Sequence, residues 1–388
     1  MVPRTGGHDS LIFMPAPFSP GDVGFYADAA QGELWIGPSH GLNEWSEALG
    51  LKVSDVSALG EFLCRKESPL VAGDSRSIAD VTSINYAPSP ELARTIAELR
   101  LVKDDWEIGE VRRAVAHTIE GFREVVAELP KAVGGGGERW LQGTFDRHAR
   151  TVGNGVGYST IVGGGAHAAT LHWVRCDGNV RKGELILLDM GVEERSFYTA
   201  DVTRTFPVSG SYTAEQRRVH DLVEKAHRAA LSKVAPGRLF SDFHITAMEV
   251  IAQGLHDWGL LPVSVDEALS PEGQHHRRWL TCGVGHHLGL DVHDCASSSY
   301  SAYQQAPLSP GMVLTVEPGL YFHQHDLMVP PELRGIGVRI EDDLLLTHAG
   351  HENLSEGLPY GAAEIENWLK DQSVAERTGG GVQQPPSG

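Results

Sequence analysis

The sequence predicts a mixed α/β protein in which a short N-terminal α/β unit precedes a larger domain made of two similar α/β halves. The length of 388 residues allows two or three domains and a core that can hold a buried site. A composition of 41% hydrophobic and 21% charged residues is typical of globular proteins. Helical and extended patterns also follow one another in the same order twice in the larger domain.

Changes in composition indicate four segments along the chain. We expect residues 1–10 to be flexible, residues 11–86 to form the N-terminal unit, and residues 87–372 to form the main domain. The segment Tyr86-Ala-Pro-Ser-Pro marks the boundary, because its two prolines interrupt regular structure. Residues 373–388 end in GGGVQQPPSG, and we expect a disordered tail there.

The first half of the main domain is expected to begin with helices at residues 91–99 and 104–129. The apolar face of the longer helix consists of Val111, Val115, Ile119, Phe122 and Val126. The elements that follow are the loop Gly134–Gly137, a helix at 138–150, and strands near 156–163, 170–174 and 184–190.

The second half repeats this order of elements without repeating the sequence. Its elements are helices at 213–234 and 240–258 around the turn Pro236-Gly237, then strands near 279–284, 312–317 and 335–347. Two such halves facing each other would leave a cleft between two sheets, which is a common place for a binding site.

The charge and the cysteines exclude several classes of protein. A formal net charge of −19 repels phosphate backbones, so we expect no nucleic-acid partner. No stretch reaches 18 apolar residues, and the N-terminus lacks a charged segment followed by a long apolar run, so we expect no membrane association. The four cysteines lie far apart without a CxxC pair, which argues against structural zinc and fits free thiols in the cytoplasm.

Two aspartates are expected to lie on neighbouring strands. Asp189 ends the apolar strand 184–189, and Asp201 lies in a second strand at 196–206, with a charged loop between the strands. A hairpin would bring the two carboxylates close together, where they need a cation or a shared proton. The alternative is that both carboxylates are exposed to water at the ends of their strands.

A cluster of histidines follows in the second half. Residues 286–294 contain three histidines and two aspartates, and glycines flank His286. These glycines indicate a close approach of the backbone to another group, and neutral imidazole is a common transition-metal ligand. For any one of these histidines alone, a hydrogen-bonded structural role is the alternative.

Two further acids lie at apolar strands. Glu317 follows an apolar strand directly, and Pro318 ends its ladder. In the strand 335–347, Arg339, Glu341 and Asp343 share one face, so alternation alone does not choose between the two acids. Taken singly, each acid is better explained as a surface carboxylate.

The joint pattern indicates a metal site. Four acids lie at or beside apolar strands, and His286 lies between them in the sequence. Oxygen ligands with one imidazole favour Mn²⁺, Co²⁺ or Fe²⁺ and tolerate Zn²⁺. Five ligands for two ions require bridging carboxylates, which would hold the ions about 3.5–4 Å apart around a shared hydroxide.

Five ordered motifs resemble those of the pita-bread metallopeptidases, specifically the aminopeptidase P branch. They are LLDMG, TADVTRTFPVSG, HHLGLDVHD, TVEPGLYF and GIGVRIEDD, within residues 100–358. The resemblance implies a pita-bread fold with two pseudo-symmetric halves and hydrolysis of an N-terminal Xaa–Pro bond by a water bridged between two divalent ions, with Mn²⁺ favoured. It also implies proline-containing peptides or related small amides as substrates, and a homo-oligomer, either a dimer or a tetramer.

The resemblance assigns roles to particular residues. The implied metal ligands are Asp189, Asp201, His286, Glu317 and Glu341. Asp201 and Glu341 would bridge the two ions. Glu317 would also be the general base that takes a proton from the attacking water and later passes it on.

Further residues would act on the substrate side of the same site. His172 and His293 match the family's substrate-side histidines, and His293 is expected to stabilise the oxyanion at the scissile carbonyl. Arg339 would hold the acidic ligands in place. Cys282 and Tyr321 are assigned to the substrate pocket.

Three features depart from the family pattern. Cys282 stands where the family commonly has a histidine, and a thiol is a weaker hydrogen-bond donor, although a stabilised thiolate there would bring new reactivity. The N-terminal unit at 11–86 is shorter than the family's usual first domain, as though truncated. The loop Gly134–Gly137 replaces a shorter turn.

Two alternatives to Xaa–Pro hydrolysis stay open at this point. Cys282 is compatible with a specialised pathway hydrolase that uses the same two ions on a modified or non-peptide amide. A non-catalytic binding module would use the same cleft, but family members of that kind usually lack the metal ligands that this sequence retains.

Overall fold

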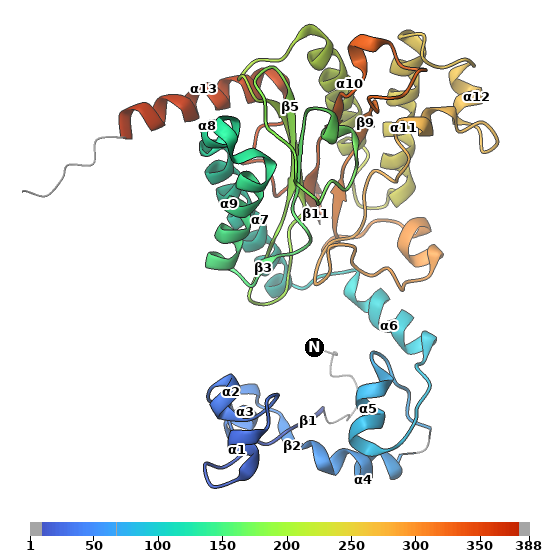
Figure 1. Ribbon diagram of the computed structural model, residues 1–388. Coiled ribbons are helices and arrows are strands. Elements are labelled where there is room, and N and C mark those ends of the chain that lie inside the picture. Colours follow the sequence, from blue (N-terminus) through green and yellow to red (C-terminus); the bar gives the residue numbers. More distant parts are fainter. Residues whose placement is uncertain (1–9, 67, 380–388) are drawn as a thin grey trace, which may run out of the picture. The chain divides into compact units, whose positions relative to one another are not determined.

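The structure is a computed structural model that describes residues 10–66 and 68–379 (Figure 1). The chain divides into two compact units, Met1–Thr95 and Ile96–Gly388. The division lies inside helix α6 (Pro90–Arg100), further along the chain than the boundary predicted after residue 86. Residues 1–9, predicted to be flexible, lie outside the described residues.

The N-terminal unit is a small mixed α/β structure built around two parallel strands. Strand β1 pairs with β2 from Leu11 opposite Lys52 to Met14 opposite Asp55. Phe13 of β1 packs on Phe62, with their ring centroids 5.2 Å apart. The elements of this unit are β1 (Leu11–Met14), α1 (Val23–Ala27), α2 (Glu33–Ile36), α3 (Leu42–Leu49), β2 (Lys52–Asp55), α4 (Leu59–Cys64) and α5 (Ser75–Thr82).

The C-terminal unit begins with a half in which two long helices pack on an antiparallel sheet of order β4-β5-β7. Helix α7 begins at a capping box, because Asp104 and Glu107 each accept a hydrogen bond from the other's backbone N–H. Its predicted apolar face is confirmed, since all five side chains are buried. The elements of this half are α7 (Asp105–Ala127), α8 (Leu129–Lys131), α9 (Gly137–Val152), β3 (Gly155–Val156), β4 (Ile161–Gly164), β5 (Leu185–Met190), β6 (Val192–Glu193) and β7 (Val202–Pro207).

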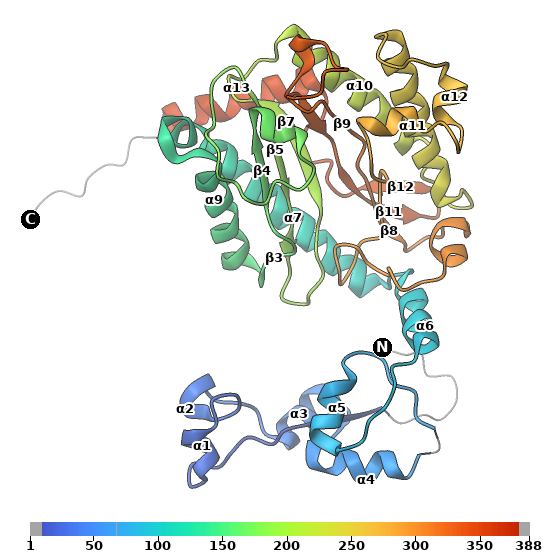
Figure 2. The same ribbon diagram turned by 45° about the vertical axis from the view of Figure 1, so that its right-hand side comes forward.

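The second half repeats this architecture. Helices α10 and α11 pack against strands β8 to β11, on the side of the unit opposite α7 and α9 (Figures 1 and 2). The elements of this half are α10 (Ala214–Leu231), α11 (Phe240–Asp257), α12 (Val265–Leu269), β8 (Val313–Val316), β9 (Gly319–Tyr321), β10 (Gly337–Arg339), β11 (Asp342–Thr347) and β12 (Gly350–Asn353). The last helix, α13 (Ala362–Gly379), packs back against α7 and β7 of the first half. Residues 373–379, assigned to the tail by the sequence analysis, continue α13, and the rest of that tail lies outside the described residues. In the described part of the chain, no helix is long and apolar enough to cross a membrane.

Two of the predicted strands are wrong. Residues 170–174 form turns after a short 3-10 helix, although their apolar residues suggested a strand. Residues 279–284 run beside β8 and β9 without a regular ladder. Gly285 explains part of this irregularity, because its backbone approaches Thr315 so closely that a Cβ there would lie 2.3 Å from the Thr315 carbonyl oxygen.

A buried arginine joins the two halves. Arg204 of β7 pairs with Asp342 of β11 at 2.6 Å, and both side chains are at most 1% exposed. The guanidinium also donates to the carbonyl oxygens of Glu341, Leu358 and Pro359. Burial opposes ionisation of Asp342, but Arg204 and the His227 ring, whose Nε2 lies 3.3 Å from Asp342 Oδ2, outweigh it, so the pKa of Asp342 lies below the usual range.

Replacing Arg204 by methionine should therefore destabilise the C-terminal unit strongly. Breaking one side of a buried pair leaves an uncompensated charge and costs about 3–5 kcal/mol. The matched control is Arg112→Met, which breaks an exposed pair with Glu352 and should cost less than about 1 kcal/mol. Urea unfolding at neutral pH measures both values, and equal losses in the two variants would contradict this account.

The same pair predicts a pH dependence of stability. The folded-state pKa of Asp342 is depressed, so its stabilisation is complete above the unfolded-state value of about 3.9 and is lost as the pH falls below it. The difference in unfolding free energy between the wild type and Arg204→Met should therefore shrink as the pH is lowered below about 4. A difference that stays constant over this range would count against the pair as its source.

Candidate active site

A cavity of about 580 Å³ lies in the C-terminal unit and is lined by residues from both of its halves. Every residue that the sequence analysis assigned to the site lines this cavity: His172, Asp189, Asp201, Cys282, His286, His293, Glu317, Tyr321, Arg339 and Glu341. Side chains that are far apart in the sequence therefore converge on one space.

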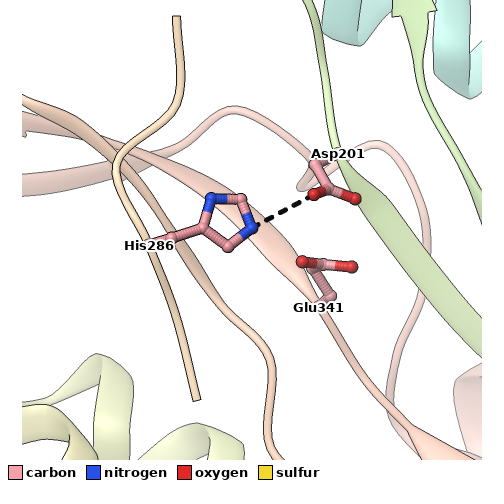
Figure 3. Close-up of side chains that lie close together, drawn as sticks. All are labelled: Asp201, His286 and Glu341. Carbon is pink, nitrogen blue, oxygen red and sulfur yellow. Dashed lines mark ion pairs between the residues drawn. The ribbon is translucent and has the colours of Figure 1, made fainter. Parts of the chain in front are cut away.

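Three of these side chains come close enough to share an ion. One ligand atom from each of Asp201, His286 and Glu341 lies within 4.8 Å of the other two. Figure 3 shows the His286 ring pointing at the Asp201 carboxylate, with the Glu341 carboxylate beside them. His286 Nε2 lies 3.3 Å from Asp201 Oδ2 and 3.6 Å from Oε1 of Glu317. The His286 Nδ1 atom hydrogen-bonds its neighbour's carbonyl, that of His287, at 3.1 Å, which leaves Nε2 facing the cavity.

The Asp189 carboxylate lies on β5 and is held from two sides. Arg339 donates a hydrogen bond to Oδ2, and the hydroxyl of Tyr158 donates to Oδ1 at 2.5 Å. Arg339 is itself fixed by Tyr321, whose hydroxyl accepts at 2.9 Å, and by Thr203 Oγ1 at 3.0 Å. This arginine therefore crosses from β10 to the opposite half and orients a cavity-lining carboxylate.

Glu341 lies where the strand predicted at 335–347 is interrupted. Strand β10 ends at Arg339 and β11 begins at Asp342, and Glu341 lines the cavity from the short link between them, as Arg339 does two residues earlier. Its Oε2 accepts a 2.7 Å hydrogen bond from Thr203. Asp343, the acid that alternation could not distinguish from Glu341, instead accepts from the backbone N–H of Asp201 at 3.0 Å.

Burial and neighbouring charges shift the pKa values of the ionisable side chains that line the cavity. Burial is the main cause that raises the pKa of Glu317 to about 7, with Asp201 and Asp189 adding to it and His286 and Arg339 opposing it. Burial and neighbouring carboxylates also place the pKa of Glu341 well above its usual range. Burial works against a charged His286, but Asp201 and Glu317 outweigh it and raise its pKa to about 9.

The excess of acids over cationic side chains in the cavity is compatible with bound cations. The cavity lining contains four acids, Asp189, Asp201, Glu317 and Glu341. Its cationic side chains are Arg339 and His286. So many carboxylates cannot all ionise together unless further positive charge compensates them. Oxygen donors around one imidazole are the set that hard and borderline divalent ions bind. The residues present therefore suit divalent metal ions.

The substrate-side residues line the rest of the cavity. The rings of His286 and His293 lie edge to face with centroids 4.4 Å apart. Burial, followed by the charge of His286, lowers the pKa of His293, which favours its neutral form. Burial and the charge of Glu317 raise the pKa of the Cys282 thiol.

The sequence analysis missed two residues of the site. Thr203 bonds both Glu341 and Arg339, and its position two residues after Asp201 on an extended segment was the available signal. Tyr158 bonds Asp189 from 31 residues earlier in the chain, and no local pattern indicated this contact.

Comparison with known proteins agrees with this geometry. A profile of metallopeptidase family M24 matches residues 109–348. Xaa-Pro aminopeptidase 2 of Streptomyces coelicolor is 47% identical over 367 residues, which cover 94% of this chain and 77% of that protein. Xaa-Pro aminopeptidase of Haemophilus influenzae is 32% identical over 343 residues, with 88% and 76% covered.

Solved structures show the same fold. A variant of Escherichia coli aminopeptidase P superposes with a TM-score of 0.82 at 29% identity, covering 94% of this chain and 83% of that one. Pseudomonas aeruginosa aminopeptidase PepP gives a TM-score of 0.79 at 27% identity over the same shares. The expected pita-bread fold is thereby confirmed. The chain belongs to metallopeptidase family M24 and is a hydrolase of the aminopeptidase P type.

Proposed function

We propose that this protein hydrolyses the N-terminal Xaa–Pro bond of peptides, using a water molecule held between two divalent metal ions. The observation that carries the proposal is the convergence of four acids and His286 on one cavity with too little positive charge to balance them. The names of the similar proteins support the choice of an Xaa–Pro bond as substrate. Membership in a hydrolase family argues against the non-catalytic binding module.

Each residue of the cavity has a definable task in this proposal. The ions would be held by Asp189, Asp201, His286, Glu317 and Glu341. When bound, such ions supply Lewis acidity and lower the pKa of water. Glu317, whose carboxylate faces the cavity, would accept a proton from water and return it to the proline nitrogen as the C–N bond breaks. Arg339 and Tyr158 fix the orientation of the Asp189 carboxylate.

The substrate side of the cavity explains how an imide bond would be held. An Xaa–Pro bond has no N–H at proline, so recognition depends on the carbonyl oxygen and on the shape of the ring. His293, whose lowered pKa favours a neutral ring, would donate to the carbonyl oxygen as negative charge develops on it. His172 lines the cavity as well and would contact the peptide. Mn²⁺ as the native ion, a cytoplasmic location and a dimeric or tetrameric assembly stay predictions.

Replacing Glu317 by glutamine should abolish peptide cleavage while leaving the fold intact. The amide cannot accept and return the proton, so kcat on Xaa-Pro-Yaa peptides with added Mn²⁺ should fall about 10²–10⁴-fold. Glu332→Gln changes an exposed glutamate outside the cavity and should leave kcat unchanged. A folded wild-type protein that cleaves no such peptide with any divalent ion would refute the proposal.

Replacing Cys282 by histidine distinguishes the specialised hydrolase from the proposed peptidase, because Cys282 lines the cavity where relatives commonly have histidine. One added hydrogen bond is worth about 0.5–1.5 kcal/mol, so kcat/KM on Xaa-Pro-Yaa peptides should change by no more than about tenfold. Cys282→Ser provides a control of similar size. If the histidine variant alone gains strong Xaa-Pro activity from an almost inactive wild type, the specialised hydrolase on another amide is the better reading.

A further inference from the structure

The cavity wall that carries His172 has no regular secondary structure of its own. Residues 164–178 run through a short 3-10 helix (Gly165–Ala169) and turns, and three of them line the cavity: Leu171, His172 and Val174. The segment begins at Gly164, the last residue of β4, and the next residue, Gly165, has a φ of +56°, in the left-handed region that favours glycine. From Thr170 onward no ladder or helix fixes the segment, so its position depends on contacts with other elements, such as the hydrogen bond from Arg339 to the carbonyl oxygen of Leu171.

A single buried carboxylate from another element bonds this segment at both ends. Glu138 lies in the first turn of α9, and its side chain is fully buried. Its Oε1 accepts from the backbone N–H of Gly164 and from Nδ1 of His167, each at 2.8 Å. Its Oε2 accepts from Nε1 of Trp173 at 2.8 Å and from the backbone N–H of Gly178 at 2.7 Å.

The local backbone is shaped to permit this arrangement. The N–H of Glu138 donates to the carbonyl oxygen of Gly178 at 3.0 Å, so the two residues are joined by backbone and side chain together. Gly137 has a φ of +64°, and a Cβ there would lie 2.5 Å from the same carbonyl oxygen. A Cβ on Gly178 would lie 2.5 Å from the His167 ring. Both positions therefore require glycine for the close approach.

The two ring donors are also packed against each other. The rings of His167 and Trp173 are stacked, with centroids 3.9 Å apart and an angle of 23° between their planes. His172 directly precedes Trp173, so the hydrogen bond from the indole fixes the residue next to the one that faces the cavity. A carboxylate suits this position because it only accepts hydrogen bonds, and it meets four donors here.

We propose that Glu138 is a positioning residue, which holds the segment 164–178 so that His172 meets the substrate in the correct place. The effect on cleavage rests on the proposed peptidase function, whereas the effect on the position of His172 does not. Glutamine has the same size as glutamate, but its NH₂ group would take the place of either Oε1 or Oε2. It would then face the two N–H donors from which that oxygen now accepts. Those donors would lose their partner while buried, and the segment would shift.

A double-mutant cycle on peptide cleavage tests the kinetic part. Glu138→Gln should lower kcat/KM on Xaa-Pro-Yaa peptides about tenfold or more, since small displacements of a positioning group are costly. In the His172→Ala background the same change should alter kcat/KM by less than about twofold, because the group being positioned is gone. An equal loss in both backgrounds would show that Glu138 supports only general stability and would overturn the proposal.

The ring signals of His172 in proton–carbon NMR spectra test the structural part without any activity. The signals are assigned by their absence from His172→Ala, and they should shift or broaden in Glu138→Gln. The matched control is Glu194→Gln, which removes another buried carboxylate that bonds a histidine, His117, at 2.5 Å. Unchanged His172 signals in Glu138→Gln would refute the positioning role, even if the wild type proved inactive on every peptide.

Discussion

The contact between the two sheets at β7 and β11 is the constraint on which the rest of the structure depends. The N–H of Glu341 donates to the carbonyl oxygen of Thr203 at 3.1 Å, so β7, the edge strand of the first half, meets the chain just before β11 beside the cavity. An arginine crosses in each direction next to this contact. Arg204 passes from the first half to Asp342, and Arg339 passes from the second half to Asp189. These crossed pairs hold both halves at the spacing that brings the cavity carboxylates together.

The same contact concentrates negative charge in a largely buried cavity. The pKa of Glu341 is raised mainly by burial and then by Asp201, whereas His286 keeps the pKa of Asp201 low despite burial. Such a cluster costs free energy unless cations or protons compensate it. Binding of cations would therefore stabilise the folded protein. The same ions would supply the Lewis acidity that the proposed hydrolysis needs. In the proposed mechanism, stability and function would therefore depend on the same charge imbalance.

Much of the fold and of the site could be predicted from the sequence because the signals are local. The buried face of α7 follows from helical spacing, and each acid that lines the cavity was predicted at or beside an apolar strand. The turns at 170–174 and 279–284 could not be predicted, because contacts with distant residues override their apolar character. Alternation did not separate Glu341 from Asp343, because both have the same parity along the strand, and only the fold directs Asp343 to the backbone N–H of Asp201. Tyr158 and Glu138 act through contacts that only the folded chain creates.

The most direct test is a titration of chelator-treated protein with Mn²⁺. Calorimetry measures how many ions bind per chain, and electron paramagnetic resonance measures the distance between them. Two ions per chain with magnetic coupling are predicted, because carboxylates shared between ions hold them about 3.5–4 Å apart. Glu341→Gln should reduce the stoichiometry or abolish the coupling. Wild-type protein that is folded, binds no ion tightly and keeps its cavity acids protonated would contradict the account.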